Sequence, residues 1–337
     1  MPFLAFLHAV AGHHHLQTEE AHEAMREILA GEVSSVQLAS FLTALRMKGE
    51  TVDELVGFAA AMRDVAVRVD VGLTGEPLLD TCGTGGDGQG TFNISTIAAF
   101  VVAGAGVKVA KHGNRSVTEQ GGSADLLESL GIAVVLPPER VAQAIREIGI
   151  GFLFAPAMHT AMKHAYSVRM ELKLRTVFNL LGPLTNPAGA TAQLVGAPSE
   201  QAAELMAGAL ARLGLERGFV VHGSDGLDEI TTTGSTSAFE ICGGTVERRT
   251  FLPEDFGVKR AEAAALKGAG KEGNAAIARA VLGGAAGAQR DVVLVNSAAA
   301  LAAAGRSADF RVAMDMAAAS IDSGAASRKV EELAAFR

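Results

Sequence analysis

A glycine-rich segment at residues 80–87, with the sequence DTCGTGGD, is the first part of the chain that could do chemistry. Its three glycines within four positions allow backbone with positive φ and a close approach to a ligand. The segment follows an apolar stretch typical of a buried strand and leads toward a helix, so its N–H groups can converge on an anion. It lacks the Gly-Lys-Ser/Thr ending of a Walker loop. Taken alone, the segment is more simply interpreted as a tight turn at a sheet edge. The neighbouring motifs decide whether it is an anion-binding loop instead.

Polar side chains gather at the start of the next expected helix, in the sequence TFNIST at residues 91–96. A single Ser or Thr is enough to cap a helix. Asn93, Ser95 and Thr96 together exceed that need, and their oxygen and nitrogen atoms would suit phosphate oxygens or a hydrated metal ion.

A basic cluster of Lys111, His112 and Arg115 directly follows an expected strand at residues 107–110. Doubly wound sheets bind their ligands at such strand ends, and Lys and Arg are the usual partners of phosphate. A charged surface cluster is the alternative. The glycines on either side of the cluster and its position after a strand favour a ligand site that continues to residue 125.

Two adjacent carboxylates, Asp228 and Glu229, lie in the sequence GSDGLDEI after an expected strand at residues 218–222. Adjacent side chains point in different directions, so two magnesium ions, or one ion with its waters, could bind there. An isolated Asp-Glu pair is usually a solvated turn. The presence of an anion-binding segment in the same chain is what favours a metal site here.

A helix expected at residues 158–173 carries His159, Met162, Tyr166 and Arg169 at spacings of three, four and three. That spacing places the four side chains on one face. An arginine on such a face could bind a carboxylate through two hydrogen bonds. A packing face with an arginine that reaches out to solvent fits the pattern equally well.

The elements around these motifs predict an α/β protein with a small helical domain and a larger domain built on a mainly parallel central sheet. Capping boxes at Ser34 and Thr51 indicate helices in the first 65 residues. Strands then alternate with helices, which is typical of parallel sheets. We assign residues 1–70 and about 157–175 to the helical domain and residues 76–156 and 176–337 to the α/β domain. The expected strands lie at 77–82, 107–110, 132–136, 152–155, 193–196, 218–222, 238–250 (a hairpin) and 292–296; residues 267–274 are expected to form a flexible surface loop.

The composition excludes several classes of protein. The 337 residues carry a net charge of −8, whereas a general nucleic-acid binder usually has a basic face. Two cysteines are too few for a disulfide framework, so we expect two buried thiols in a reducing cytoplasm. The longest apolar run, at residues 97–107, is too short to span a membrane, and the apolar N-terminus lacks the basic flank of a signal peptide.

Taken together, the motifs resemble the anthranilate phosphoribosyltransferase family over nearly the whole chain. The strings that carry the resemblance are GTGGD at 83–87, FNIST at 92–96, KHGNRSV at 111–117, GSAD at 122–125, RTVFNLLGPLTNP at 175–187 and GLDE at 226–229. Several such motifs in this order are far more specific than any one of them.

The resemblance implies a reaction in tryptophan biosynthesis in which phosphoribosyl pyrophosphate and anthranilate give phosphoribosyl-anthranilate and pyrophosphate. It also implies Mg²⁺, a homodimer and a fold related to the pyrimidine nucleoside phosphorylases. Ser95, Asp228 and Glu229 should bind the metal, and Gly83, Asn114, His159 and Arg169 should contact anthranilate. Lys111 would stabilise the leaving pyrophosphate, and His112 could accept the amine proton late in the reaction. The implied site for phosphoribosyl pyrophosphate comprises Gly83, Gly86, Asp87, Thr91, Asn93, Ile94, Ser95, Thr96, Lys111, His112, Gly113, Asn114, Arg115, Ser116, Val117, Thr118, Glu119 and Ser123.

The chain departs from the family pattern in three places. After KHGNRSV the family usually has Ser-Ser-Lys-Ser-Gly-Ser, whereas this chain has TEQGGS at residues 118–123. Glu119 introduces a carboxylate near the phosphates, and Gln120 removes a positive charge. Thr160 and Ser167 replace common prolines on the anthranilate side.

Two other functions fit the same fold. A nucleoside phosphorylase would use phosphate as the nucleophile, but that family has a different lysine-serine motif where this chain has KHGNRS. A relative that binds single-stranded nucleic acid would need a basic surface, which the net charge of −8 and the GLDE motif argue against.

Overall fold

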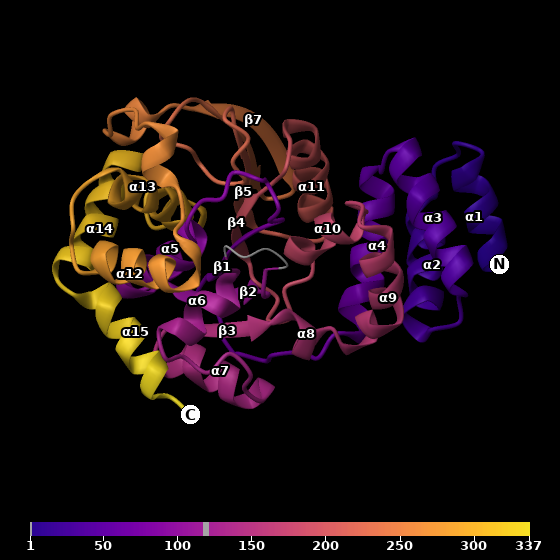
Figure 1. Cartoon of the computed structure of the whole chain (residues 1–337), viewed down its shortest axis with the longest axis horizontal. Coiled ribbons are helices and arrows are strands. Elements are labelled where there is room, and N and C mark those ends of the chain that lie inside the picture. Colours follow the sequence, from indigo (N-terminus) through magenta and orange to yellow (C-terminus); the bar gives the residue numbers. More distant parts are fainter. Residues whose placement is uncertain (1, 117–120) are drawn as a thin grey trace.

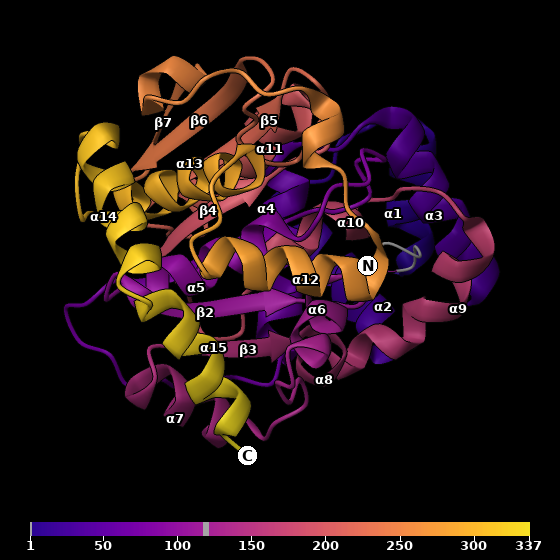
Figure 2. The same cartoon turned by 60° about the vertical axis from the view of Figure 1, so that its left-hand side comes forward.

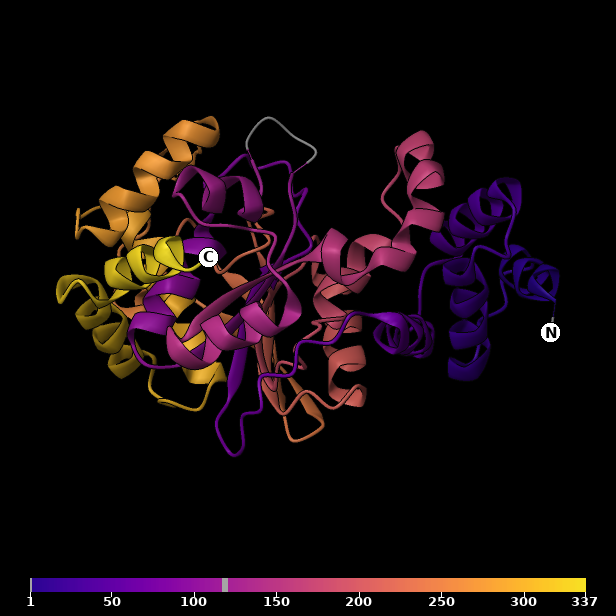
Figure 3. The same cartoon turned by 90° about the horizontal axis from the view of Figure 1, so that it is seen from below.

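The computed structural model describes residues 2–116 and 121–337 of the chain. A lobe of helices at the N-terminal end adjoins a larger lobe in which helices surround a sheet (Figure 1). Figure 3 shows the polypeptide passing between the two lobes more than once. This arrangement confirms the expected fold class, a small helical domain with a larger α/β domain, while the domain boundaries at single residues stay a prediction.

The helical lobe packs four N-terminal helices with one helix from the middle of the chain. The capping boxes expected at Ser34 and Thr51 are confirmed. Gly57 lets two of these helices come close, because a Cβ there would lie 2.2 Å from the carbonyl oxygen of Thr18. The helices are α1 (Phe3–Ala11), α2 (Thr18–Ala30), α3 (Ser35–Lys48), α4 (Val52–Val65) and α9 (Lys163–Leu172).

The central sheet has seven strands in the order β3-β2-β1-β4-β5-β6-β7. The first five in this order are parallel, and the last two form the expected antiparallel hairpin. The mainly parallel sheet brings the carboxyl ends of its central strands to one edge. The strands are β1 (Leu78–Gly83), β2 (Lys108–Gly113), β3 (Ile150–Phe154), β4 (Ala192–Gly196), β5 (Arg217–Gly223), β6 (Thr236–Cys242) and β7 (Thr245–Phe251).

Helices cover both faces of the sheet. On one face a large aliphatic core forms around α5 (Ile94–Gly104) and α13 (Ala288–Ala303). On the other face α11 (Glu200–Arg212) packs on the sheet and also on α4, so one core cluster runs from the sheet into the helical lobe. Figure 2 shows α12 lying across the first face, next to α6. The remaining helices are α6 (Ser123–Ser129), α7 (Pro138–Glu147), α8 (Ala155–Met158), α10 (Phe178–Leu181), α12 (Gly270–Leu282), α14 (Phe310–Asp322) and α15 (Ala325–Ala335), with short 3-10 turns η1 (Thr160–Met162), η2 (Gly182–Leu184), η3 (Pro253–Phe256) and η4 (Ala263–Leu266).

Several expected elements are wrong. Residues 132–136 form no strand but irregular structure. Residues 292–296 lie inside α13, a helix whose residues there are all buried, and a run of buried apolar residues has the same sequence pattern as a buried strand. Residues 267–274 are not a free loop, because α12 begins at Gly270 and the N–H of Gly268 bonds to the carbonyl of Gly90. Cys242, expected to be buried, is exposed at the end of β6.

Within the described residues no helix combines the length and the apolar character that crossing a membrane requires.

Candidate functional site

The polar segments singled out in the sequence meet at the carboxyl ends of the parallel strands. β1 leads into the glycine loop, residues 84–92, and β5 leads into the carboxylate loop, residues 224–230. The N–H of Gly85 donates a 2.7 Å hydrogen bond to Asp228 Oδ2, so the two loops are in direct contact. Glycine is required at positions 83 and 196, since a Cβ would lie 2.7 Å from Asp228 Oδ2 at the first and 1.6 Å from the Asp228 carbonyl at the second.

Three acidic side chains lie close together at this contact. Burial and the nearby charge of Asp87 raise the pKa of Asp228 to about 6. Burial and the charge of Asp228 raise the pKa of Glu229 to about 8. Glu229 Oε1 also accepts a 3.2 Å hydrogen bond from the N–H of Ser95 at the start of α5. Neighbouring like charges in a buried site, where burial raises the pKa of the carboxyl groups, favour the binding of a cation.

The oxygen donors here fit a magnesium ion that is shared with phosphate. Asp87 Oδ2 is buried and accepts no hydrogen bond within the described residues. Among the described residues, no three or more His, Cys, Asp or Glu side chains lie together so that they could hold a metal ion by themselves. A metal ion here would therefore need further ligands from a substrate. Mg²⁺ is commonly held by one or two carboxylates together with substrate phosphates. Asp228 and Glu229, with Ser95 beside them, therefore suit an ion whose other ligands come from a bound pyrophosphate.

The glycine loop presents unused donors. Gly85 and Gly86 both have positive φ, at 64° and 68°. The N–H groups of Gly86 and Asp87 have no acceptor within residues 2–116 and 121–337, and Thr84 Oγ1 is buried without a partner. Such a run of free donors is typical of an anion-binding loop.

Lys111 and His112 lie within β2, not after it, because the pairing with β3 continues to Gly113. Lys111 is buried, and its Nζ donates to the carbonyl oxygen of Thr81 on β1. Burial lowers the pKa of Lys111, while the charges of Asp80 and Glu229 oppose that shift. Its ammonium group thus lies behind the site and is tied to the backbone.

The two histidines of the site are neutral. Burial lowers the pKa of His112 to about 3 and that of His159 to about 4, and their rings lie 5.2 Å apart. The backbone of Gly182 acts against the lowering of the pKa of His112, and the backbone of Thr185 acts against that of His159. Nε2 of each ring is buried and has no partner in the described chain. Both rings therefore offer one uncommitted nitrogen to a ligand.

The helix expected at residues 158–173 is interrupted, which separates the four side chains expected on one face. His159 has φ −114° and ψ 60° between α8 and η1, and α9 begins only at Lys163. Tyr166 is exposed, whereas the guanidinium of Arg169 lies 5.0 Å from the ring centre of Phe178. Within the described residues Arg169 has no carboxylate partner. A half-buried, unpaired guanidinium suits a carboxylate ligand.

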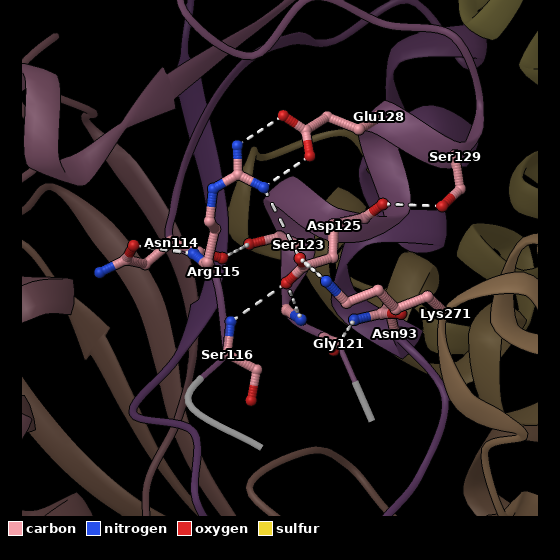
Figure 4. A network of polar contacts seen from close by, with 11 residues as sticks. Asn93, Asn114, Arg115, Ser116, Gly121, Ser123, Asp125, Glu128, Ser129 and Lys271 are labelled. Carbon is pink, nitrogen blue, oxygen red and sulfur yellow. Dashed lines mark hydrogen bonds and ion pairs between the residues drawn. The ribbon is translucent and has the colours of Figure 1, made fainter. Parts of the chain in front are cut away.

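The segment after β2 forms the polar network of Figure 4. Arg115, expected to bind phosphate, makes two 2.5 Å hydrogen bonds to Glu128. Asp125 accepts from the N–H groups of Ser116 and Gly122 at 3.2 and 2.8 Å. Lys271 on α12 contacts the same carboxylate at 2.7 Å. Asp125 therefore links Ser116, which follows β2, to Gly122 at the start of α6.

Asn93 connects this network to the start of α5, and Asn114 lies within the network. Asn93 Nδ2 donates to the Gly121 carbonyl at 3.1 Å, and Asn93 Oδ1 accepts from Asn274 at 3.2 Å. Asn114 accepts from the N–H of Arg115 through Oδ1, and its carbonyl oxygen accepts from the Ser123 hydroxyl at 3.3 Å. These contacts gather expected ligand residues from separate segments into one wall of the site.

The other expected ligand residues are placed unevenly. Ile94 and Thr96 are buried in the first turn of α5, and Thr91 forms a β-bridge with Lys267. Gly113 lies against Ser123, whose Oγ would be 2.3 Å from a Cβ at that position. Val117, Thr118 and Glu119, like Gln120, lie outside the described residues.

Sequence reasoning missed Arg175, which contacts the glycine loop. Arg175 Nη1 donates to the carbonyl oxygens of Gly85 and Gly86 at 2.8 and 2.9 Å. Its only signal in the sequence is its place in the string RTVFNLLGPLTNP, which contributed to the resemblance without indicating a role.

Two family models match the chain. The helical bundle domain of the glycosyl transferase family matches residues 4–66, and the a/b domain of that family matches residues 75–327. The second match alone covers more than half of the chain.

Relatives and solved structures are similar over the full length. Anthranilate phosphoribosyltransferase of Solibacter usitatus is 66% identical over 336 residues, covering 100% of this chain and 99% of the relative. The Moorella thermoacetica enzyme of that name is 56% identical, covering 97% and 96%. The crystal structure of the Thermus thermophilus enzyme has a TM-score of 0.93 at 47% identity, covering 98% of each chain. The Saccharomyces cerevisiae enzyme in complex with PRPP and Mg has a TM-score of 0.90 at 30% identity, covering 98% and 96%.

Proposed function

The chain belongs to the anthranilate phosphoribosyltransferases of the glycosyl transferase family, and from its site we propose how it performs that reaction. It transfers the phosphoribosyl group of phosphoribosyl pyrophosphate to the amine of anthranilate and releases pyrophosphate. One observation carries the proposal: the 2.7 Å bond from Gly85 to Asp228, which joins an anion-binding loop to a pair of buried carboxylates. Pyrophosphate and a magnesium ion would share that junction.

The donor half of the reaction needs charge stabilisation. As the bond from C1′ to pyrophosphate breaks, negative charge grows on the leaving group and the ribose gains oxocarbenium character. The N–H groups of Gly86 and Asp87 have no acceptor within the described residues and are placed to stabilise that charge. Magnesium, when bound by Asp228, Glu229 and Ser95, would neutralise pyrophosphate oxygens. Lys111 adds positive potential from behind the site, where it is buried.

The acceptor half needs orientation. Arg169, which has no carboxylate partner within the described residues, would bind the anthranilate carboxylate, with Gly83 and Asn114 close to the ring. The aromatic amine is already neutral and can attack C1′ without a strong base. The uncommitted Nε2 of His112 or His159 would accept the proton that the amine loses after attack.

We expect a cytoplasmic homodimer that functions in tryptophan biosynthesis. Exposed apolar side chains on the helical lobe support a dimer that forms there: Leu4 on α1, Val36 and Met47 on α3, and Met170 on α9.

The direct test mixes the protein with Mg²⁺, phosphoribosyl pyrophosphate and anthranilate and follows the loss of anthranilate fluorescence. We expect loss that requires all three components, with pyrophosphate formed in equal amount. No loss of fluorescence would refute the proposed acceptor. Release of ribose 1-phosphate from a pyrimidine nucleoside, or a gel shift of single-stranded DNA, would instead favour one of the two other functions.

A further inference from the structure

Arg175 occupies the point where the helical lobe, the glycine loop and the carboxylate loop meet. It lies between α9 and α10, and its carbonyl oxygen accepts a hydrogen bond from Arg46 on α3. Its Nη1 bonds to the carbonyls of Gly85 and Gly86. The N–H of Gly85 is bonded in turn to Asp228. The backbone of the glycine loop is therefore held from two opposite sides by side chains distant in sequence.

The two carbonyls that Arg175 binds determine where two N–H groups point. In a trans peptide the C=O and the N–H are antiparallel, and the described chain contains no cis peptide bond. The carbonyl of Gly85 shares its peptide with the N–H of Gly86, and the carbonyl of Gly86 shares its peptide with the N–H of Asp87. Because both carbonyls face one guanidinium nitrogen, both N–H groups face away from it.

Neither of these two N–H groups has an acceptor in the described chain. We propose that Arg175 is a positioning residue that orients the peptide planes of the glycine loop so that the N–H groups of Gly86 and Asp87 converge on the pyrophosphate of the substrate. Gly86 is needed for the same contact, because its φ is 68° and a Cβ there would lie 2.7 Å from Arg175 Nη1. The inference deepens the proposed function and rests on its donor half.

A role in packing alone does not account for this arginine. Its Nη2 is buried and makes no hydrogen bond within the described residues. A buried unpaired donor costs free energy, so a residue selected only for packing would not retain it.

The chain offers a matched control. Arg311 on α14 also donates to the carbonyls of two successive residues, Glu254 and Asp255, far from the glycine loop in the sequence. It also lies against a glycine of positive φ, since a Cβ on Gly257 would lie 2.4 Å from Arg311 Nη1. The pair Arg311 and Gly257 is therefore a comparable contact outside the site, in which an arginine binds two successive carbonyls beside a glycine of positive φ.

The test measures pyrophosphate affinity by calorimetry, with Mg²⁺ present and no acceptor, in the full-length protein. We expect Arg175→Met and Gly86→Ala each to weaken binding about tenfold to a hundredfold, the range for the loss of one hydrogen bond to a charged group. Arg311→Met and Gly257→Ala should bind pyrophosphate as the unaltered protein does. In steady-state assays the KM for phosphoribosyl pyrophosphate should rise in the first pair, with the KM for anthranilate unchanged.

Each result bears on the inference. Unchanged pyrophosphate affinity in folded Gly86→Ala, or in folded Arg175→Met, would overturn it, as would equal weakening in the Arg311→Met control. Since binding is measured without anthranilate, a failed transfer reaction with the unaltered protein would refute the proposed function and leave this inference standing. If Arg175→Met does not fold, Gly86→Ala alone decides.

Discussion

Asp228 and Glu229 are held in a protonation state that depends on what binds beside them. Burial raises the pKa of both groups, the charge of Asp87 raises the pKa of Asp228 further, and the charge of Asp228 raises that of Glu229. A bound cation would reverse that balance and keep both groups charged. The structure thus explains chemically why two adjacent acidic residues are placed in a buried loop that also faces an anion site.

We expect Asp228→Asn to lower turnover by roughly 10²-fold or more, because the leaving pyrophosphate loses much of its charge stabilisation. The loss should be partly recovered at higher Mg²⁺ concentration if metal binding is what the substitution weakens. Turnover is measured by fluorescence across a magnesium titration. Asp53→Asn serves as control, since Asp53 forms an exposed ion pair with Arg212. Near-normal turnover of Asp228→Asn at ordinary magnesium would contradict the metal assignment.

His112 predicts a pH dependence of stability. Its pKa is about 3 in the folded protein and about 6.5 when unfolded. Between these values the unfolded chain binds the extra proton, so this histidine makes the free energy of unfolding rise from pH 3 to 6.5 and stay level above. His112→Gln should show a smaller rise between pH 4.5 and 6.5 in urea denaturation. The exposed His14→Gln is the control, and equal pH slopes in the His112 variant and the unaltered protein would contradict the assignment.

At the scale of elements, α13 supports the carboxylate loop from the core. Asn296 is fully buried on this helix, accepts from the N–H of Ile230 at 3.0 Å and donates to the carbonyl of Ile230 at 2.9 Å. The residue that it holds directly follows Glu229. A helix on one face of the sheet therefore fixes the backbone that carries the metal-binding side chains.

Asn296→Leu should lower the free energy of unfolding by about 1–3 kcal/mol, since it leaves buried backbone groups unpaired. It should also raise the Mg²⁺ concentration needed for half-maximal turnover. The neighbouring Ser297→Ala removes only a hydroxyl bonded within α13 and should leave the magnesium requirement unchanged. Thermal melting and magnesium titration measure the two effects. A variant that melts early but keeps the normal magnesium requirement would refute the positioning role.

Helix α13 also shows which secondary-structure elements the sequence predicts correctly and which it does not. The alternation of strands and helices predicted the parallel part of the sheet, and the capping boxes at Ser34 and Thr51 located two helix starts, because these signals are local. Residues 292–296 were misassigned because a helix buried on all sides has no polar face and therefore no readable period. The break at His159 was also missed, since no proline or glycine marks it in the sequence.

At the scale of the whole molecule, the two lobes share one core cluster through α4 and α11. The site lies where the sheet lobe meets the segment that carries Arg169 and Arg175. The helical lobe therefore influences the site in two ways, through the acceptor residues that it supports and through the bond from Arg46 to Arg175.

The exposed apolar surface of the helical lobe predicts the assembly. Met47→Glu, at a side chain that is 76% exposed on α3, should convert the expected dimer to a monomer, because a buried unpaired charge opposes association. Light scattering coupled to size-exclusion chromatography measures the mass. Val135→Glu, at an exposed apolar position in the α/β domain, is the matched control and should not change it. A monomeric unaltered protein would rule out the dimer outright.

The sequence by itself determined the class of fold, the order of the motifs and the chemical types of residue that serve them, because capping, periodicity and motif spacing are properties of neighbouring residues. Only the tertiary structure decided which groups meet. It placed Arg175 on two carbonyls about 90 residues away in the chain and Asn296 on the carboxylate loop. It also paired Arg115 with Glu128 and made two histidines neutral by burial. Such contacts depend on how distant segments pack, and no local pattern encodes that packing.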